Sequence, residues 1–91
     1  MNFEWDSKKA AVNLKKHAVS FHDAAMIFAD PLSITSHDPD HSAAEHRFIT
    51  VGLDQARRVL IVSHTDRGET IRIISARNTT RQERKYYEEG K

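Results

Sequence analysis

Histidines, carboxylates and an arginine are concentrated in the stretch "HDPDHSAAEHR", which runs from His37 to Arg47. Such residues bind metal ions, transfer protons or line a solvated loop. His37 and His41 are four residues apart, which would align them on a helix, but Pro39 stands between them and the surrounding residues are typical of a turn. We therefore predict a loop here, and neither a metal site nor a bound cofactor.

Arginines and a histidine at the ends of predicted strands form a second candidate site. The guanidinium groups of Arg47, Arg72 and Arg77 are suited to stabilising an oxyanion. His64 ends an apolar run, and a histidine there can act as a general acid or base near neutral pH. The alternative for His64 is a semi-buried, hydrogen-bonded side chain without a chemical role. The alternative for the arginines is a surface ion pair with Glu45, Glu69 or Glu83.

Charge is divided unevenly along the 91 residues, although the net charge is only +1. Residues 1–44 carry a net charge of −2 and residues 45–91 a net charge of +3, and all eight arginines lie at or after Arg47. Because the planar fork of arginine grips phosphate at two points, this half is predicted to bind an oxyanion. Arginines that merely solvate a face are the alternative.

A short strand and a helix are predicted at the N-terminus. The strand covers residues 2–5, and the helix covers residues 8–17 after a cap at Asp6 or Ser7. Lys16 and His17 end this helix, where cations interact favourably with the helix dipole. That interaction is a sufficient structural reason for their presence.

A second helix is predicted over residues 20–28. Ser20 and Asp23 have the spacing of a capping box, and apolar residues recur at helical intervals after them. The helix must end before Pro31, which cannot continue it.

Four β-rich runs follow, separated by turn-like residues: "LSITS", "HRFITVGL", "RVLIVSHT" and "TIRIISAR". They predict an antiparallel meander, and Thr80 with Glu83 predicts a capping box for a final helix. This order favours an α+β fold: an antiparallel sheet with two N-terminal helices and one C-terminal helix, in a single domain over residues 1–91. The sequence has no cysteine, no long apolar run and no export signal, so we expect a soluble cytoplasmic protein.

The meander would bring Arg47, His64 and Arg72 to one end of the sheet. A two-residue turn at Arg67 and Gly68 would pair Ser63 with Arg72. His64 and Arg72 would then lie on opposite faces, with Arg77 on the face of His64. A bulge would reverse this parity.

Five segments, in order along nearly the whole chain, resemble the BrnT family of type II toxin-antitoxin ribonucleases. They are "FEWDSKKAAVNLKKHAVSF", "AAMIFADPL", "DPDHSAAEHRF", "VSHTDRGETIRIISAR" and "TTRQERKYYEE". Ala18 and Asn78 depart from residues that are common in such chains. The resemblance implies a RelE-like fold, cleavage of messenger RNA that stops translation, and a ribbon-helix-helix antitoxin of the BrnA type. It also implies that the toxin–antitoxin complex represses its own promoter.

In that case Arg47, Arg72 and Arg77 would bind the phosphate and His64 would transfer a proton, without a metal ion. A second proton carrier stays open among Lys16, His17, His41 and Glu45. The cations expected to bind RNA are Lys16, His17, Arg81 and Arg84. A different class of function, a non-catalytic basic module that docks a protein or nucleic acid, uses the same arginines.

Overall fold

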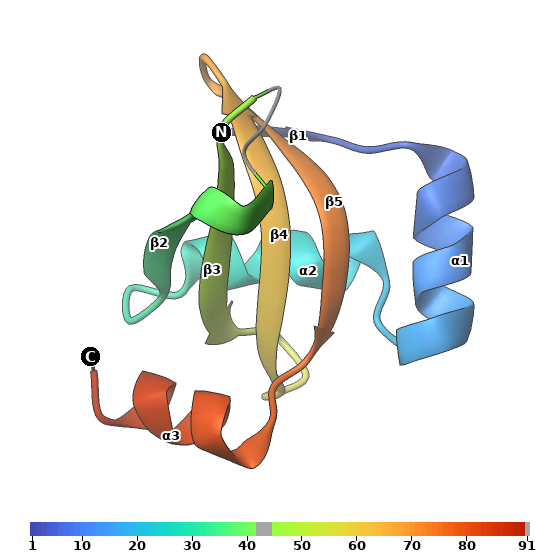
Figure 1. The fold of residues 1–91 in the computed structure, drawn as a ribbon. Coiled ribbons are helices and arrows are strands. Elements are labelled where there is room, and N and C mark those ends of the chain that lie inside the picture. The colour runs from blue at the N-terminus through green and yellow to red at the C-terminus, as the bar shows by residue number, and fades with distance from the viewer. Residues whose placement is uncertain (42–44, 91) are drawn as a thin grey trace.

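The computed structural model describes residues 1–41 and 45–90, and its elements follow the predicted order (Figure 1). The strands are β1 (Asn2–Glu4), β2 (Ile34–Asp38), β3 (Arg47–Leu53), β4 (Val59–Arg67) and β5 (Thr70–Asn78). The α-helices are α1 (Ser7–His17), α2 (Phe21–Met26) and α3 (Arg81–Glu88), and the 3₁₀ turns are η1 (Ile27–Ala29) and η2 (Pro39–His41). The predicted α+β class, with two helices before the meander and one after it, is confirmed.

Each helix begins where a side chain satisfies the free backbone N–H groups of its first turn. The Asp6 carboxylate accepts hydrogen bonds from the N–H groups of Lys8 and Lys9. Ser20 caps α2 by accepting from the N–H of Asp23. At α3 the predicted capping box is present, since Thr80 and Glu83 each accept from the backbone of the other.

The sheet has the strand order β1-β5-β4-β3-β2. Strands β2 to β5 form the predicted antiparallel meander. Strand β1 was not predicted to join it, but it pairs in parallel with the start of β5, from Asn2↔Thr70 to Glu4↔Arg72. The sheet is therefore mixed, and the N-terminal strand lies beside the last strand (Figure 1).

The predicted pairing of Ser63 with Arg72 is wrong. The turn between β4 and β5 consists of Gly68 and Glu69, since Arg67 already pairs with Thr70. Gly68 has φ +62°, the left-handed conformation that glycine adopts without strain. Thr65 is consequently the residue opposite Arg72.

A bulge next to His64 decides which face the later residues of β5 occupy. His64 pairs with Ile73 while Ser63 pairs with Ser75, so Ile74 is the extra residue. His64 and Arg72 lie on opposite faces, as predicted, but Arg77 lies opposite Ile61 and not on the face of His64. The inserted residue reverses the parity of every position after it.

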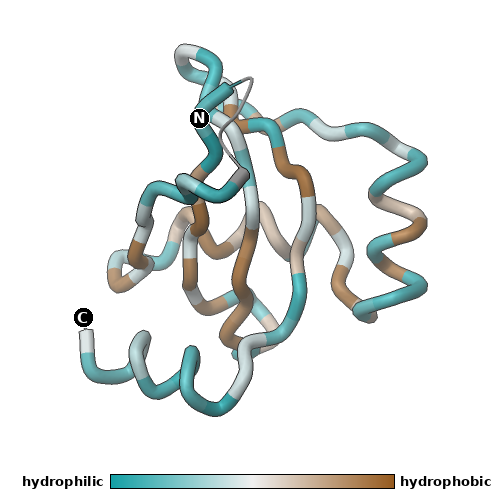
Figure 2. The backbone as a smooth tube through the Cα atoms, in the orientation of Figure 1, coloured by the Kyte–Doolittle hydropathy of each residue, from teal (hydrophilic) through white to brown (hydrophobic). Residues whose placement is uncertain are grey.

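The core lies between α2 and one face of the sheet. Leu60, Val62, Ile73 and Ala76 of the sheet are buried against Phe21, Ala24 and Ile27. Figure 1 shows α2 running across this face, and the hydropathy colouring of Figure 2 is apolar along the central strands. We call the α2-covered side the inner face and the opposite side the outer face. None of the helices in the described ranges has the length and apolar character that a membrane span requires.

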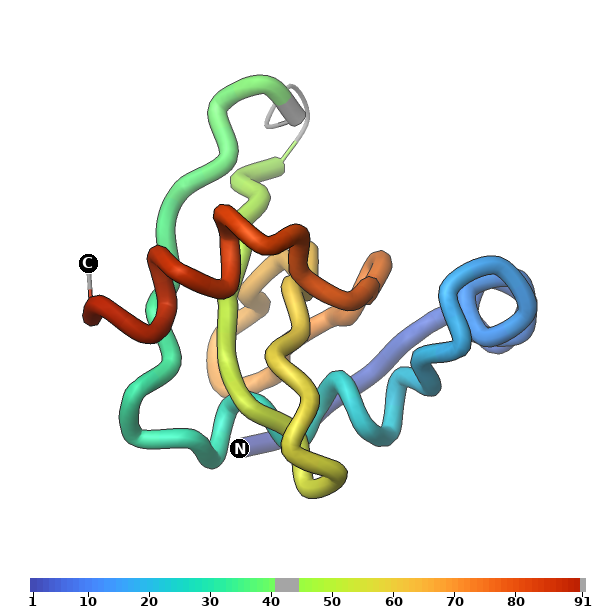
Figure 3. Tube along the Cα trace, turned by 90° about the horizontal axis from the view of Figure 1, so that it is seen from below, coloured from blue at the N-terminus to red at the C-terminus, as the bar shows by residue number. Residues whose placement is uncertain are grey.

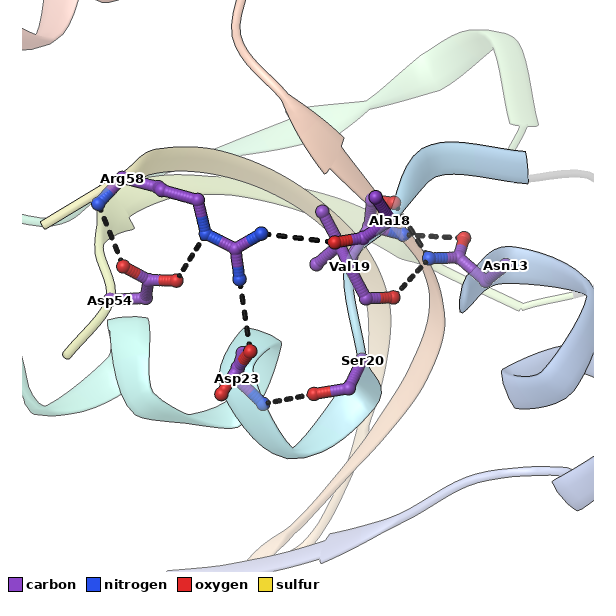
Figure 4. A network of polar contacts seen from close by, with 8 residues as sticks. Asn13, Ala18, Val19, Ser20, Asp23, Asp54 and Arg58 are labelled. Atoms are coloured by element: carbon purple, nitrogen blue, oxygen red, sulfur yellow. Dashed lines mark hydrogen bonds and ion pairs between the residues drawn. The ribbon is translucent and has the colours of Figure 1, made fainter. Parts of the chain in front are cut away.

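Helix α1 is fixed to the edge of β5 by a side chain that replaces a missing strand. Beyond Arg72, β1 no longer pairs with β5. The Asn13 amide donates to the Ala76 carbonyl (2.8 Å) and accepts from the Ala76 N–H (3.1 Å), as a neighbouring strand would. It also donates to the carbonyl of Val19 (3.0 Å), which fixes the link between α1 and α2 (Figure 4).

The β3–β4 hairpin is tied to the same link. The Arg58 guanidinium binds the buried carboxylate of Asp54 (2.9 Å), the carboxylate of Asp23 (2.9 Å) and the carbonyl of Ala18 (3.0 Å) (Figure 4). These contacts hold the α1–α2 connection against the β3–β4 hairpin, at the other end of the sheet from Thr65.

Candidate functional site

Arg47, Thr65 and Arg72 lie side by side on the outer face, on β3, β4 and β5. Thr65 pairs directly with both arginines. Residues that pair in this way in antiparallel strands share a face and hold their Cβ atoms about 4.5–5.5 Å apart. The prediction that Arg47, His64 and Arg72 meet at one end of the sheet is confirmed, although His64 lies on the inner face.

Arg72 is engaged by a carboxylate on the neighbouring strand. Its guanidinium lies 3.0 Å from the carboxylate of Glu4, and the two side chains are 31% and 40% exposed. An ion pair in contact with solvent is weak and exchanges readily for another anion. Arg47 is also engaged in a polar interaction, and its cross-strand neighbours are Thr65 on β4 and Asp38 on β2.

Arg77 shares the outer face but lies at its other end, beside α3. Its guanidinium binds both carboxylate oxygens of Glu83, at 2.8 and 3.0 Å. This hydrogen bonding is the main cause that lowers the pKa of Glu83 to about 2. The same pair raises the pKa of Arg77. The surface ion pair proposed for Glu83 is therefore present, and Arg77 joins the end of β5 to the start of α3.

His64 is 1% exposed and lies in the core. Its Nε2 is 2.7 Å from the Thr50 hydroxyl and its Nδ1 is 2.9 Å from the Asp66 carboxylate. Phe28 meets the ring edge-on and Phe48 stacks on it. Desolvation lowers the pKa of His64, and the contact with Asp66 only partly opposes this shift. A buried ring with both nitrogens hydrogen-bonded agrees with the interpretation of His64 as a structural side chain.

The cations of α1 line a groove along the unpaired edge of β5. The groove has a volume of about 350 Å³ and is bounded by Val12, Asn13, Ile74 and Ser75 as well as by Lys8, Lys9, Lys16 and His17. Ser75 pairs with Ser63, two residues from Thr65, and so lies on the outer face. Of the cations that the sequence assigned to RNA binding, Lys16 and His17 therefore border the same face as the two arginines.

Arg81 and Arg84 are exposed on α3 and do not join that group. Arg84 lies 3.1 Å from Glu88 on the same helix. Helix α3 crosses below the lower ends of the central strands (Figures 1 and 3). Between it and the outer face is an apolar groove of about 440 Å³, lined in part by Ile49, Ile61 and Tyr86.

The histidine-rich stretch leads from β2 into β3. His37 Nε2 and His46 Nδ1 are 3.2 Å apart, and Glu45 lies 3.4 Å from Arg67. The side chain of His41 and all of residues 42–44 lie outside the described residues. Within residues 1–41 and 45–90, no three potential ligands gather into a metal site. The absence of a metal requirement stays a prediction.

Sequence reasoning missed Thr65, Lys8 and Lys9. The run "SHTD" alternates its side chains between the two faces, so a threonine between two inward residues must face outward. That alternation was readable in the sequence, but the residues opposite Thr65 were not, because the turn and the bulge set the register. Lys8 and Lys9 lie in the first turn of α1, and no local sequence pattern predicts that this helix packs at the edge of β5.

Comparison with known proteins adds a family and a fold. Residues 5–83 match a family model described as the ribonuclease toxin, BrnT, of type II toxin-antitoxin system. The fold is similar to the crystal structure of the ribonuclease toxin BrnT of Brucella abortus, with a TM-score of 0.65 and 23% sequence identity. The match covers 89% of this chain and 99% of that chain, and at this identity it concerns the fold alone. No curated protein matches the sequence.

Proposed function

The chain belongs to the BrnT family of ribonuclease toxins of type II toxin-antitoxin systems, and from this premise we propose that it cleaves messenger RNA without a metal ion and so inhibits translation. The observation that carries the proposal is the pair of arginines, Arg47 and Arg72, on either side of Thr65 on the outer face. Residues 1–91 would act as one domain, in the cytoplasm.

Metal-free cleavage of RNA needs cations for the dianionic phosphorane, a base for the 2′-hydroxyl and an acid for the leaving oxygen. Arg47 and Arg72 would supply the cations. Arg77 would take part only after exchanging Glu83 for a phosphate, because the two guanidinium nitrogens that would bind the phosphate already donate to Glu83.

Proton transfer is proposed for groups in two different surroundings. His64 has both ring nitrogens hydrogen-bonded in the core, so it would exchange protons with solvent through Asp66, whose side chain is 47% exposed. Lys16, His17 and Glu45 lie nearer the surface and are alternative carriers. His41 belongs to the same set but its side chain is outside the described residues.

The groove beside α1 would hold the RNA backbone next to the two arginines. Lys8, Lys9, Lys16 and His17 line it, so it offers cations along one edge of the outer face. When lysines bind phosphates, counterions are released from the RNA. Added salt opposes this release and so weakens the binding. RNA affinity is therefore expected to fall with ionic strength.

The test is cleavage of a labelled RNA by the purified protein after exhaustive chelation with EDTA. We expect the rate to be unchanged, because guanidinium groups replace the metal ion in stabilising negative charge. A dinucleotide with a 2′-deoxyribose at the cleaved position is the matched control and should resist cleavage. Activity that disappears with EDTA and returns only with a divalent ion would contradict the metal-free mechanism. An absence of any cleavage would favour the non-catalytic binding module.

A ribbon-helix-helix antitoxin of the BrnA type is the proposed partner, and operator DNA would be bound only through the toxin–antitoxin complex. Arg81 and Arg84 are exposed on α3, the helix that contributes Gln82, Glu83 and Tyr86 to the apolar groove, and an acidic or helical antitoxin segment would cover them. Attraction between opposite charges would speed the encounter. Antitoxin and RNA would then compete for the outer face.

Charge reversal on α3 tests this docking face. Arg81→Glu combined with Arg84→Glu is expected to weaken antitoxin binding, and more at low than at high ionic strength, because salt screens exposed charges. The dissociation constant is measured across ionic strength. Lys8→Glu with Lys15→Glu makes the same change of charge on α1 and should weaken binding less. Equal effects of the two double variants would show that only net charge matters.

A further inference from the structure

We propose that Thr65 completes a phosphate-binding subsite on the outer face, where its hydroxyl donates a hydrogen bond to a non-bridging oxygen of the RNA phosphodiester between Arg47 and Arg72. This inference rests on the proposed ribonuclease function and adds a residue to its site. The ligand class is a phosphate oxyanion, which in the substrate is the phosphodiester of RNA.

The first observation is a buried hydroxyl on the outer face that has no hydrogen-bond partner among the described residues. Thr65 is 1% exposed, and its Oγ1 is the buried side-chain oxygen that lacks a hydrogen-bond partner within the described part of the chain. Buried polar groups nearly always have a partner, because leaving one unpaired destabilises the fold. The unpaired hydroxyl of Thr65 therefore requires an explanation, and a bound ligand would supply the missing hydrogen-bond acceptor.

The second observation is that hydrogen bonds hold the side chains on either side of Thr65 in the strand. His64 and Asp66 point to the inner face and are joined there by a hydrogen bond of 2.9 Å. His64 also meets Thr50, which in turn is 2.7 Å from Thr35. The bulge next to His64 fixes the register of β5 at the same point. Bulges commonly occur beside active sites, where they redirect side chains. The hydroxyl of Thr65 is thus placed by a rigid strand and not by a loop.

The third observation is the charge on both sides of the hydroxyl. A cation would be repelled by Arg47 and Arg72, the two cross-strand neighbours of Thr65. A phosphodiester carries a negative charge and its non-bridging oxygens only accept hydrogen bonds, which matches two guanidinium groups and one free O–H. The ion pair of Arg72 with Glu4 is partly exposed, so the guanidinium can turn from the carboxylate to the phosphate.

Thr65→Val separates this role from a structural one, since valine keeps the shape and removes the hydroxyl. We expect the affinity for inorganic phosphate, titrated by NMR, to fall about 10- to 100-fold, as for the loss of a hydrogen bond to a charged group. The rate of RNA cleavage should fall by a similar factor. The melting temperature should rise by about 4–8 °C, because an unpaired buried hydroxyl has been removed.

Two further variants complete the experiment. Thr65→Ser keeps the hydroxyl and should retain phosphate binding and cleavage. Thr79→Val removes a hydroxyl that donates to the Val59 carbonyl at the other end of the sheet, and should leave phosphate binding unchanged.

The outcomes distinguish this inference from the proposed function. If Thr65→Val binds phosphate and cleaves RNA as the unaltered protein does, the subsite is refuted while the ribonuclease function stands. If Thr65→Val melts at a lower temperature and binds phosphate normally while folded, the hydroxyl is structural and the inference is also refuted. If the unaltered protein binds phosphate through Thr65 but cleaves no RNA, the anion site stands and the ribonuclease function fails.

Discussion

Replacing Arg72 with alanine is expected to slow RNA cleavage by a factor of about 10²–10³ and to leave the protein folded, since a lost donor to the transition-state charge has about this effect. The loss in stability should be small. The ion pair of Arg72 with Glu4 joins two partly exposed side chains, and such pairs contribute at most about 1 kcal/mol. Single-turnover cleavage and thermal denaturation measure the two effects separately.

Glu4→Gln distinguishes a catalytic Arg72 from a structural one. If Arg72 acts on the phosphate, loss of the competing carboxylate should keep or raise the rate of cleavage. If Arg72 matters only because it holds β1 against β5, Glu4→Gln should reduce activity as strongly as Arg72→Ala. The second result would contradict the assignment.

Arg57→Asn is the matched control for the loss of one positive charge. Arg57 lies in the β3–β4 hairpin, away from Thr65, and has φ 66°, a conformation that asparagine tolerates. Cleavage should be nearly unchanged in this variant. Arg47→Ala is expected to behave as Arg72→Ala does.

Arg77 is the arginine for which sequence and structure give different expectations. The sequence predicts a catalytic side chain, whereas its two bonds to Glu83 connect β5 to α3. Arg77→Ala would thus lose stability as well as activity if both descriptions hold.

The elements of the fold were predictable because their ends are encoded locally. Asp6, Ser20 and Thr80 each cap the helix that follows, and Pro31 lies just beyond the end of η1. The parallel pairing of β1 was not predictable. Three residues carry no pattern that selects a partner strand almost 70 residues away, and only the folded sheet provides that edge.

The sequence predicts that the site residues lie at one end of the sheet, but it does not predict which side chains contact one another there. Arg47 and Arg72 meet because any meander brings those strand ends together. Which residues face them depends on the two-residue turn at Gly68 and on the extra residue Ile74, and a shift of one position moves every side chain to the other face. His64 was assigned to proton transfer because it ends an apolar run, although a position in an alternating apolar strand equally fits the core.

Asn13→Ala is expected to give the largest loss of stability, about 2–5 kcal/mol of unfolding free energy, because it leaves buried backbone groups unpaired. Asn13 is 6% exposed. It is bonded to the N–H and carbonyl of Ala76 and to the carbonyl of Val19. The expected loss is a large share of the total stability of about 5–15 kcal/mol that is usual for a domain. Urea denaturation measures it, and Asn78→Ala, on the same strand but exposed, should change stability by no more than about 0.5 kcal/mol.

Loss of Asn13 should also affect RNA binding, because this side chain sets the distance between α1 and β5 and hence the width of the groove that Lys9 and Lys16 line. Asn13→Asp provides a finer test. A carboxylate still accepts from the Ala76 N–H but cannot donate to the two carbonyl oxygens, which it instead repels. The variant should therefore be less stable at pH 7 than at pH 4, relative to the unaltered protein, because a protonated carboxyl group can donate again. If Asn13→Ala and Asn78→Ala unfold at the same urea concentration, α1 must be held to the sheet by its apolar contacts, and the position of its cations then depends on packing and not on the mimicry of a strand.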